Sequence, residues 1–310
     1  MRVEDTLDGE DYDEFAWLGE IGAGYGLPPR SPAVRRRRYD LDLQRWISAL
    51  QWGEGEPEMA LLHGGSQNAH TWDAMLLDLD RPALAIDLPG HGRSSRSPDA
   101  NYGALRNADA LADLLPRVAP QARIVIGMSL GALTAIRLAS LLGPWIDKLV
   151  LVDATPPVDD VPINRSRAAE RGIADTQRLP RYETFDGILA VAQANNPRRT
   201  RESVAREARL NAVRLEDGGW SWRFDVAARR PQDPANWAEM LSLWEDVDRI
   251  RVPTMLVRAQ HSRFVSDANV AMLRQRLPEA RVEVMPDSGH AIQTDQPRAL
   301  AALIRDFCFT

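Results

Sequence analysis

Short apolar runs alternate with helical spacing along the first half of the chain. The runs MALLH (59–63), ALAIDL (83–88), RIVIG (123–127) and KLVLVD (148–153) each precede a segment in which apolar residues recur at helical spacing. Strands that alternate with helices form parallel βαβ units. Because these strands are apolar on both sides, each face of the sheet must be covered. The pattern predicts an α/β fold with a mostly parallel central sheet and helices on both faces.

The alternation resumes near the C-terminus. VPTMLVRA (252–259), a helix near residues 269–276, RVEVMP (281–286) and a helix over Pro297–Phe309 follow one another. Upstream of all these, the runs VRRRRYDLDL and RWISALQWGE predict an antiparallel hairpin at one edge of the sheet. We interpret the Arg35–Arg38 run within it as a solvated strand face.

The strand pattern disappears between Ala154 and about Val247. This stretch is rich in Arg and Glu and contains helical patches such as FDGILAVAQ. We therefore predict a helical cap over residues 154–247, inserted after the sixth strand, between the two parts of one core at 33–153 and 248–310. Residues 1–32 are acidic and then rich in Gly and Pro, which predicts a loosely held arm.

Composition excludes several classes of protein. A net charge of −6 in 310 residues gives no electrostatic reason to expect nucleic-acid binding. The longest uncharged apolar stretch, 124–136, falls short of the roughly 20 residues that a membrane-spanning helix needs. The acidic first residues do not resemble a secretory signal, so we expect a cytoplasmic location. Cys308 is the only cysteine, which excludes an intramolecular disulfide.

The strongest chemical signal is the motif Gly127-Met128-Ser129-Leu130-Gly131. This G-x-S-x-G sequence follows an apolar strand and precedes a helical run. A sharp strand-to-helix turn strains the serine backbone and presents its hydroxyl above the sheet. The helix start also favours developing negative charge. The motif predicts that Ser129 is a nucleophile.

An acyl-transfer enzyme also needs two amides that bind the oxyanion. His63-Gly64-Gly65-Ser66 ends an apolar strand, and we predict that the backbone N–H of Gly65 serves with that of Leu130. We interpret His63 as a brace for this loop and Ser66 as a turn residue.

His290 is the best candidate for the base. Asp287-Ser288-Gly289-His290 follows the strand RVEVM, which places the histidine on a loop at the same sheet edge as Ser129. The segment Asp87-Leu88-Pro89-Gly90-His91-Gly92-Arg93-Ser94 is typical of a structural turn. His70, His91 and His261 are interpreted as loop or helix-start residues.

The motifs HGGS, DLPGHGRS, GMSLG, LVLVD and DSGHAIQTDQP occur in the order and spacing of the α/β-hydrolase superfamily. The chain resembles this superfamily from about residue 33 to 308, and most of all the single-chain esterases with a helical cap. The resemblance implies a triad in the order serine, acid, histidine, with Ser129 and His290 at two of its positions.

The chain departs from that superfamily at the acid. The turn after the seventh strand reads Ala259-Gln260-His261-Ser262, without the carboxylate usual there. Some relatives carry the acid after the sixth strand, where Asp153 stands, and Asp267 is the alternative. We predict Asp153, because a strand end is rigid whereas Asp267 is interpreted as a helix cap.

These residues predict a serine hydrolase that acts on a small ester, thioester or lactone through an acyl-enzyme, without a metal or organic cofactor. Alternatives are a C–C hydrolase, a perhydrolase or a natural-product lyase or cyclase on the same scaffold, and a ligand-binding receptor without turnover. The cap tryptophans could line a pocket, but we expect them to join cap and core; they are Trp220, Trp222, Trp237 and Trp244. Substrate identity and oligomeric state stay open.

Overall fold

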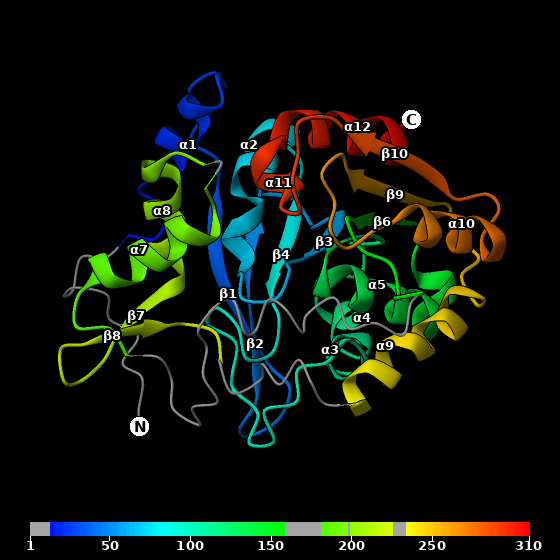
Figure 1. The fold of residues 1–310 in the computed structure, drawn as a ribbon, viewed down its shortest axis with the longest axis horizontal. Coiled ribbons are helices and arrows are strands. Elements are labelled where there is room, and N and C mark those ends of the chain that lie inside the picture. The colour runs from blue at the N-terminus through cyan, green and yellow to red at the C-terminus, as the bar shows by residue number, and fades with distance from the viewer. Residues whose placement is uncertain (1–12, 159–180, 198, 226–233) are drawn as a thin grey trace.

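The computed structural model describes residues 13–158, 181–197, 199–225 and 234–310, and its centre is one eight-stranded sheet (Figure 1). The strand order is β1-β2-β4-β3-β5-β6-β9-β10. β2 pairs antiparallel with β1 and β4, and the remaining neighbours are parallel. The strands are β1 (Val34–Asp40), β2 (Trp46–Trp52), β3 (Met59–Leu62), β4 (Ala83–Asp87), β5 (Ile124–Met128), β6 (Lys148–Val152), β9 (Thr254–Ala259) and β10 (Arg281–Met285).

Helices cover both faces of this sheet. One face packs against α3 (Ala104–Ala112), α4 (Leu115–Val118), α5 (Leu130–Leu142), α9 (Pro234–Val247) and α10 (Asp267–Arg276). The other packs against α1 (Leu18–Gly24), the 3-10 helix η1 (Ala69–Trp72), α2 (Asp73–Leu79), α11 (Ile292–Asp295) and α12 (Pro297–Phe309). Every residue of β3, β4 and β5 is buried, as a sheet covered on both sides requires. The predicted architecture is confirmed.

Strand register brings the chemical motifs to one edge. Leu62 pairs with both Ile86 and Gly127, and Val152 pairs with Met128 and Val257. The loops after β3, β4, β5 and β6 therefore leave the sheet side by side, at the carboxyl edge where ligands bind in such folds.

The N-terminal segment differs from the expected loose arm. Leu18 and Ile21, one helical turn apart in α1, are buried in the same apolar cluster as α2 and α12. Two apolar residues on one face of a short helix are enough to dock it, which the surrounding glycines concealed. The prediction is wrong for residues 15–27, whereas residues 28–32 are mostly exposed and irregular; residues 1–12 lie outside the described part.

The inserted segment contains a small sheet as well as helices. It comprises α7 (Phe185–Asn195), α8 (Arg201–Asn211), and the antiparallel pair β7 (Ala212–Arg214) and β8 (Trp220–Trp222). Figure 1 shows these elements together beside the core, whereas α9 lies with the core helices. The expectation of an entirely helical insertion is thus wrong at β7 and β8. Residues 159–180 and 226–233 of the predicted cap are outside the described ranges.

The tryptophans of this region pack within one unit or the other. Trp220 belongs to an apolar cluster inside the insertion, with Trp222 packed against it. Trp244 is buried in the core cluster beside Leu243 of α9. The expectation that the tryptophans join cap to core therefore holds for Trp244, which lies in the predicted cap segment and packs on the core, and is wrong for Trp220 and Trp222, which pack within the insertion.

Candidate active site

Ser129 occupies a strained turn between β5 and α5. Its φ of 52° and ψ of −115° lie in a region that side chains other than glycine rarely adopt. Its N–H donates to the Val152 carbonyl at 3.1 Å, which fixes the serine beside the end of β6. A Cβ at Gly127 would lie 2.2 Å from the Gly131 oxygen, and one at Gly131 would lie 2.1 Å from the Leu62 oxygen. Both glycines of the motif are therefore needed for close backbone packing.

Asp153 and His290 meet at the same edge. Nδ1 of His290 donates to Oδ2 of Asp153 at 2.8 Å, and the N–H of Ala259 donates to Oδ1 at 2.9 Å. Asp153 is fully buried, and its own N–H donates to the Val257 carbonyl at 2.8 Å. Because a carboxylate only accepts, the proton of a neutral His290 lies on Nδ1 and Nε2 keeps a free lone pair. Phe264 packs on the imidazole at 3.8 Å between ring centroids.

Asp267 lies elsewhere. Its side chain is 95% exposed and forms an ion pair with Arg258. A helix does begin there, as expected, but its N-cap is Ser266, whose side chain accepts from the N–H of Asn269 in a capping box. Asp267 is the first residue of α10. The interpretation of Asp267 as the cap is wrong, and of the two candidate acids Asp153 contacts His290.

The loop after β3 forms a tight turn beside the nucleophile. Gln67 N–H donates to the Gly64 carbonyl at 3.2 Å, and Gly64 N–H donates to Oε1 of Gln67 at 2.9 Å. A Cβ at Gly64 would lie 3.2 Å from Cβ of Ser129. Within the described chain, the N–H groups of Gly65 and Leu130 have no hydrogen-bond partner. Both amides are thus available to an oxyanion.

His63 braces this loop, as predicted. Its Nδ1–H donates to the Gly64 carbonyl at 2.7 Å, and its Nε2 accepts from Leu88 N–H at 2.9 Å. Complete burial lowers the pKa of His63, so the ring stays neutral and serves as donor on one side and acceptor on the other.

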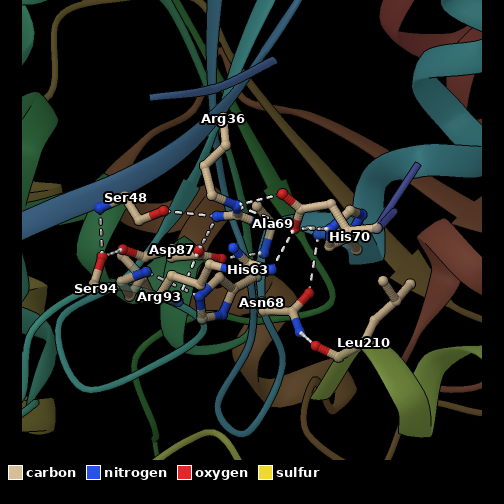
Figure 2. A network of polar contacts seen from close by, with 12 residues as sticks. Arg36, Ser48, His63, Asn68, Ala69, His70, Asp87, Arg93, Ser94 and Leu210 are labelled. Carbon is tan, nitrogen blue, oxygen red and sulfur yellow. Dashed lines mark hydrogen bonds and ion pairs between the residues drawn. The ribbon is translucent and has the colours of Figure 1, made fainter. Parts of the chain in front are cut away.

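A buried charge network lies behind the loop (Figure 2). The Arg36 guanidinium contacts Oδ2 of Asp87 and Oε2 of Glu14, each at 2.7 Å. Oδ1 of Asp87 accepts from Ala69 N–H at 2.7 Å, which confirms a structural role for this carboxylate. The interpretation of Arg36 as part of a solvated face is wrong, because its side chain turns inward, between exposed Arg35 and Arg37, and Asp87 offers it a partner.

His70 lies at the centre of the same network. Its Nδ1 contacts Asp73 at 2.8 Å and its Nε2 contacts Glu14 at 3.2 Å. Burial alone would lower the pKa of His70, but the two carboxylates outweigh it and raise the pKa to about 9. The interpretation of His70 as a loop or helix-start residue is confirmed by its place in η1, but its ion pair with Glu14 joins residues 56 positions apart and leaves no local pattern.

Among the described residues, neither a metal-binding cluster nor a membrane-spanning helix is found. Across residues 13–158, 181–197, 199–225 and 234–310, no three His, Cys, Asp or Glu side chains are grouped so that they could hold a metal ion. Within the same ranges, no helix is both long and apolar enough to cross a bilayer.

Comparison with known proteins identifies the family. A family model described as the alpha/beta hydrolase family matches residues 59–303. The esterase Rv0045c of Mycobacterium tuberculosis is 40% identical over 98% of each chain, and a solved structure of that esterase superposes with a TM-score of 0.85, 39% identity and coverage of 97% of this chain and 100% of the other.

A more distant relative, 2-(acetamidomethylene)succinate hydrolase of Mesorhizobium japonicum, is 26% identical over 84% of this chain and 91% of its own. The predicted hydrolase class is thereby confirmed, and an esterase function is supported. With its fold and the greater part of its length matched, this chain belongs to the α/β hydrolase family.

Proposed function

We propose that the protein hydrolyses small carboxylic esters through an acyl-enzyme on Ser129. The observation that carries the proposal is the hydrogen bond from His290 to buried Asp153, beside a serine held in a strained turn. The Ser129 oxygen attacks the ester carbonyl carbon while its proton passes to Nε2 of His290. The alcohol leaves with that proton, and water then attacks the acyl-enzyme while His290 takes the water's proton. The bond between the acyl group and the Ser129 oxygen breaks, the carboxylic acid leaves, and His290 returns the proton to Ser129.

Two amides stabilise the charge that develops on the carbonyl oxygen. Gly65 follows Gly64, which packs closely on Ser129, Leu130 is the next residue after Ser129, and neither N–H has a partner among the described residues. Preorganised donors of this kind contribute most in the transition state, where the oxygen carries its full charge. We assign the oxyanion hole to this pair.

Asp153 keeps His290 in its working tautomer. With Nδ1–H directed to the carboxylate, Nε2 faces the reaction, and the negative charge stabilises the imidazolium that forms. Ala259 N–H holds the other carboxylate oxygen, so the acid cannot rotate freely.

Esters are the favoured substrates, with thioesters and lactones as chemically similar alternatives. The relative at 40% identity over nearly the whole chain is an esterase, whereas the relative that acts on 2-(acetamidomethylene)succinate is much less similar. The inserted elements α7, α8, β7 and β8, within the predicted cap 154–247, would act as a lid that selects substrates. A cytoplasmic location remains a prediction.

Hydrolysis of nitrophenyl esters of graded chain length, with a thioester and a lactone added, tests this proposal. Ser129→Ala should abolish turnover of every substrate that the wild-type protein cleaves. Ser242→Ala, at an exposed serine of α9, should leave turnover unchanged. Turnover that persists in Ser129→Ala would exclude the acyl-enzyme, and absence of turnover in every class would favour a C–C bond or binding function.

A further inference from the structure

We infer that Asn211, at the end of α8 in the inserted segment, is a positioning residue that sets the direction of the proposed oxyanion donor Gly65. The inference rests on the proposed function, because it assigns Asn211 a part in the hydrolysis proposed above. Two hydrogen bonds, joined through two peptide groups, lead from the insertion to the peptide that carries the N–H of Gly65.

The first of these hydrogen bonds, from Asn211 to Ser66, is buried. Nδ2 of Asn211 donates to the Ser66 carbonyl at 2.6 Å, and Asn211 is only 6% exposed. Ser66 has a φ of 67°, in the left-handed region where this position of a tight turn favours glycine. A strained conformation persists only where its surroundings hold it, and the Asn211 amide supplies one such hold.

Two peptide groups carry the contact onward. The Ser66 carbonyl and Gln67 N–H belong to one peptide, and that N–H donates to the Gly64 carbonyl at 3.2 Å. The Gly64 carbonyl in turn shares a peptide with Gly65 N–H. Because a trans peptide is planar, fixing its carbonyl also fixes the direction of its N–H. Asn211 therefore restrains Gly65 N–H through the Ser66–Gln67 and Gly64–Gly65 peptides.

Asn68 fastens the same junction from the core side. Its Nδ2 donates to the Leu210 carbonyl at 2.9 Å, at the end of α8 where helix carbonyls lack helical partners, and its Oδ1 accepts from His70 N–H at 3.0 Å (Figure 2). Ala69, the next residue, is held by Asp87. The turn thus lies between a firm attachment to the sheet and an attachment to the insertion, so a displacement of α8 would reach the oxyanion hole.

The expected effect of removing this contact is intermediate. His63 also holds the Gly64 carbonyl, at 2.7 Å, so Gly65 N–H would be loosened rather than lost. Loss of a whole oxyanion donor lowers kcat by about 10²- to 10³-fold, so we expect a fall of about 10-fold in Asn211→Ala. Asn211→Asp should be more severe, because its carboxylate cannot donate and repels the Ser66 carbonyl.

The experiment measures kcat and KM for nitrophenyl acetate and a longer ester. The concentration of active sites, determined by titration with a fluorophosphonate, is used to calculate kcat. The inference predicts an equal fall in kcat for both esters, an unchanged KM, and a matching loss of affinity for an aryl trifluoromethyl ketone, whose bound oxyanion imitates the transition state. Asn196→Ala should behave as wild type, because among the described residues its side chain bonds the Ala192 carbonyl, within the insertion and away from the β3 loop.

Two results would overturn the inference. One is a kcat per active site within twofold of wild type in both Asn211 variants. The other is a loss confined to melting temperature and to the fraction of labelled sites, as a merely structural residue would give. Failure of the proposed function is distinguishable, since hydrolysis would then persist in Ser129→Ala or be absent from the wild-type protein.

Discussion

Replacing Asp153 by Asn changes one atom at the point where the site is most constrained. Both carboxylate oxygens accept an N–H: Oδ2 from His290 at 2.8 Å and Oδ1 from Ala259 at 2.9 Å. An asparagine has one acceptor oxygen, and its amide group must then face either His290 or the Ala259 N–H. Residue 153 is fully buried, so bulk solvent does not relieve the mismatch.

The backbone donor decides the orientation. The backbone N–H of Ala259 is always a donor, so the asparagine oxygen must face it and the asparagine NH2 group must face His290. Neutral His290 can then move its proton to Nε2 and accept from that NH2 group through Nδ1. That tautomer blocks the nitrogen that should take the proton of Ser129. In a serine protease the same substitution lowers kcat about 10⁴-fold, which corresponds to about 5.5 kcal/mol of transition-state stabilisation. We expect a loss of similar order in Asp153→Asn.

Steady-state kinetics at pH 8 measures this loss, and a melting curve confirms that the variant folds. Asp267→Asn is the matched control, because it removes a carboxylate whose ion pair with Arg258 lies at an exposed position. Its kcat should stay within twofold of wild type. A folded Asp153→Asn protein with more than a tenth of wild-type kcat would refute the assignment of the acid.

Three further predictions concern stability and substrate choice. The pKa of His70 is raised from 6.5 to about 9, so its contribution to the free energy of unfolding is complete below about pH 6.5 and is lost as pH rises through about 9. Urea unfolding at a series of pH values should show this loss, and Glu14→Gln should make the loss smaller. Gly131→Ala should lower the free energy of unfolding by about 3 kcal/mol or prevent folding, since its Cβ would meet a backbone oxygen at 2.1 Å; wild-type stability in urea would contradict this. Trp220→Ala should change the ranking of esters or lower the melting temperature while a fluorophosphonate still labels Ser129; a folded variant without labelling would count against a lid role.

Local motifs made much of the fold and site predictable. Apolar strands between helical runs specify a covered parallel sheet, and the motif around Ser129 needs only its flanking glycines and its place between strand and helix. His290 followed from the same logic of strand ends. The choice of Asp153 depended on a missing carboxylate after a later strand, and the structure brings that residue to His290.

Two physical causes account for the main errors: partners distant in sequence and elements too short to leave a pattern. Arg36 is one arginine in a run of four, and its burial follows from the position of Asp87 across the sheet. The three-residue strands β7 and β8 are too short for alternation to reveal them. Likewise, the contact of Asn211 with Ser66 joins residues 145 positions apart, and no local pattern announces it.

Covalent labelling of Ser129 tests the central claim most directly. The protein would be treated with a fluorophosphonate, its remaining activity followed against time, and its peptides analysed by mass spectrometry. The account predicts one adduct per chain on the peptide containing Ser129, formed in step with loss of esterase activity and absent from Ser129→Ala. An adduct on a different residue, or full inactivation without modification of Ser129, would contradict it.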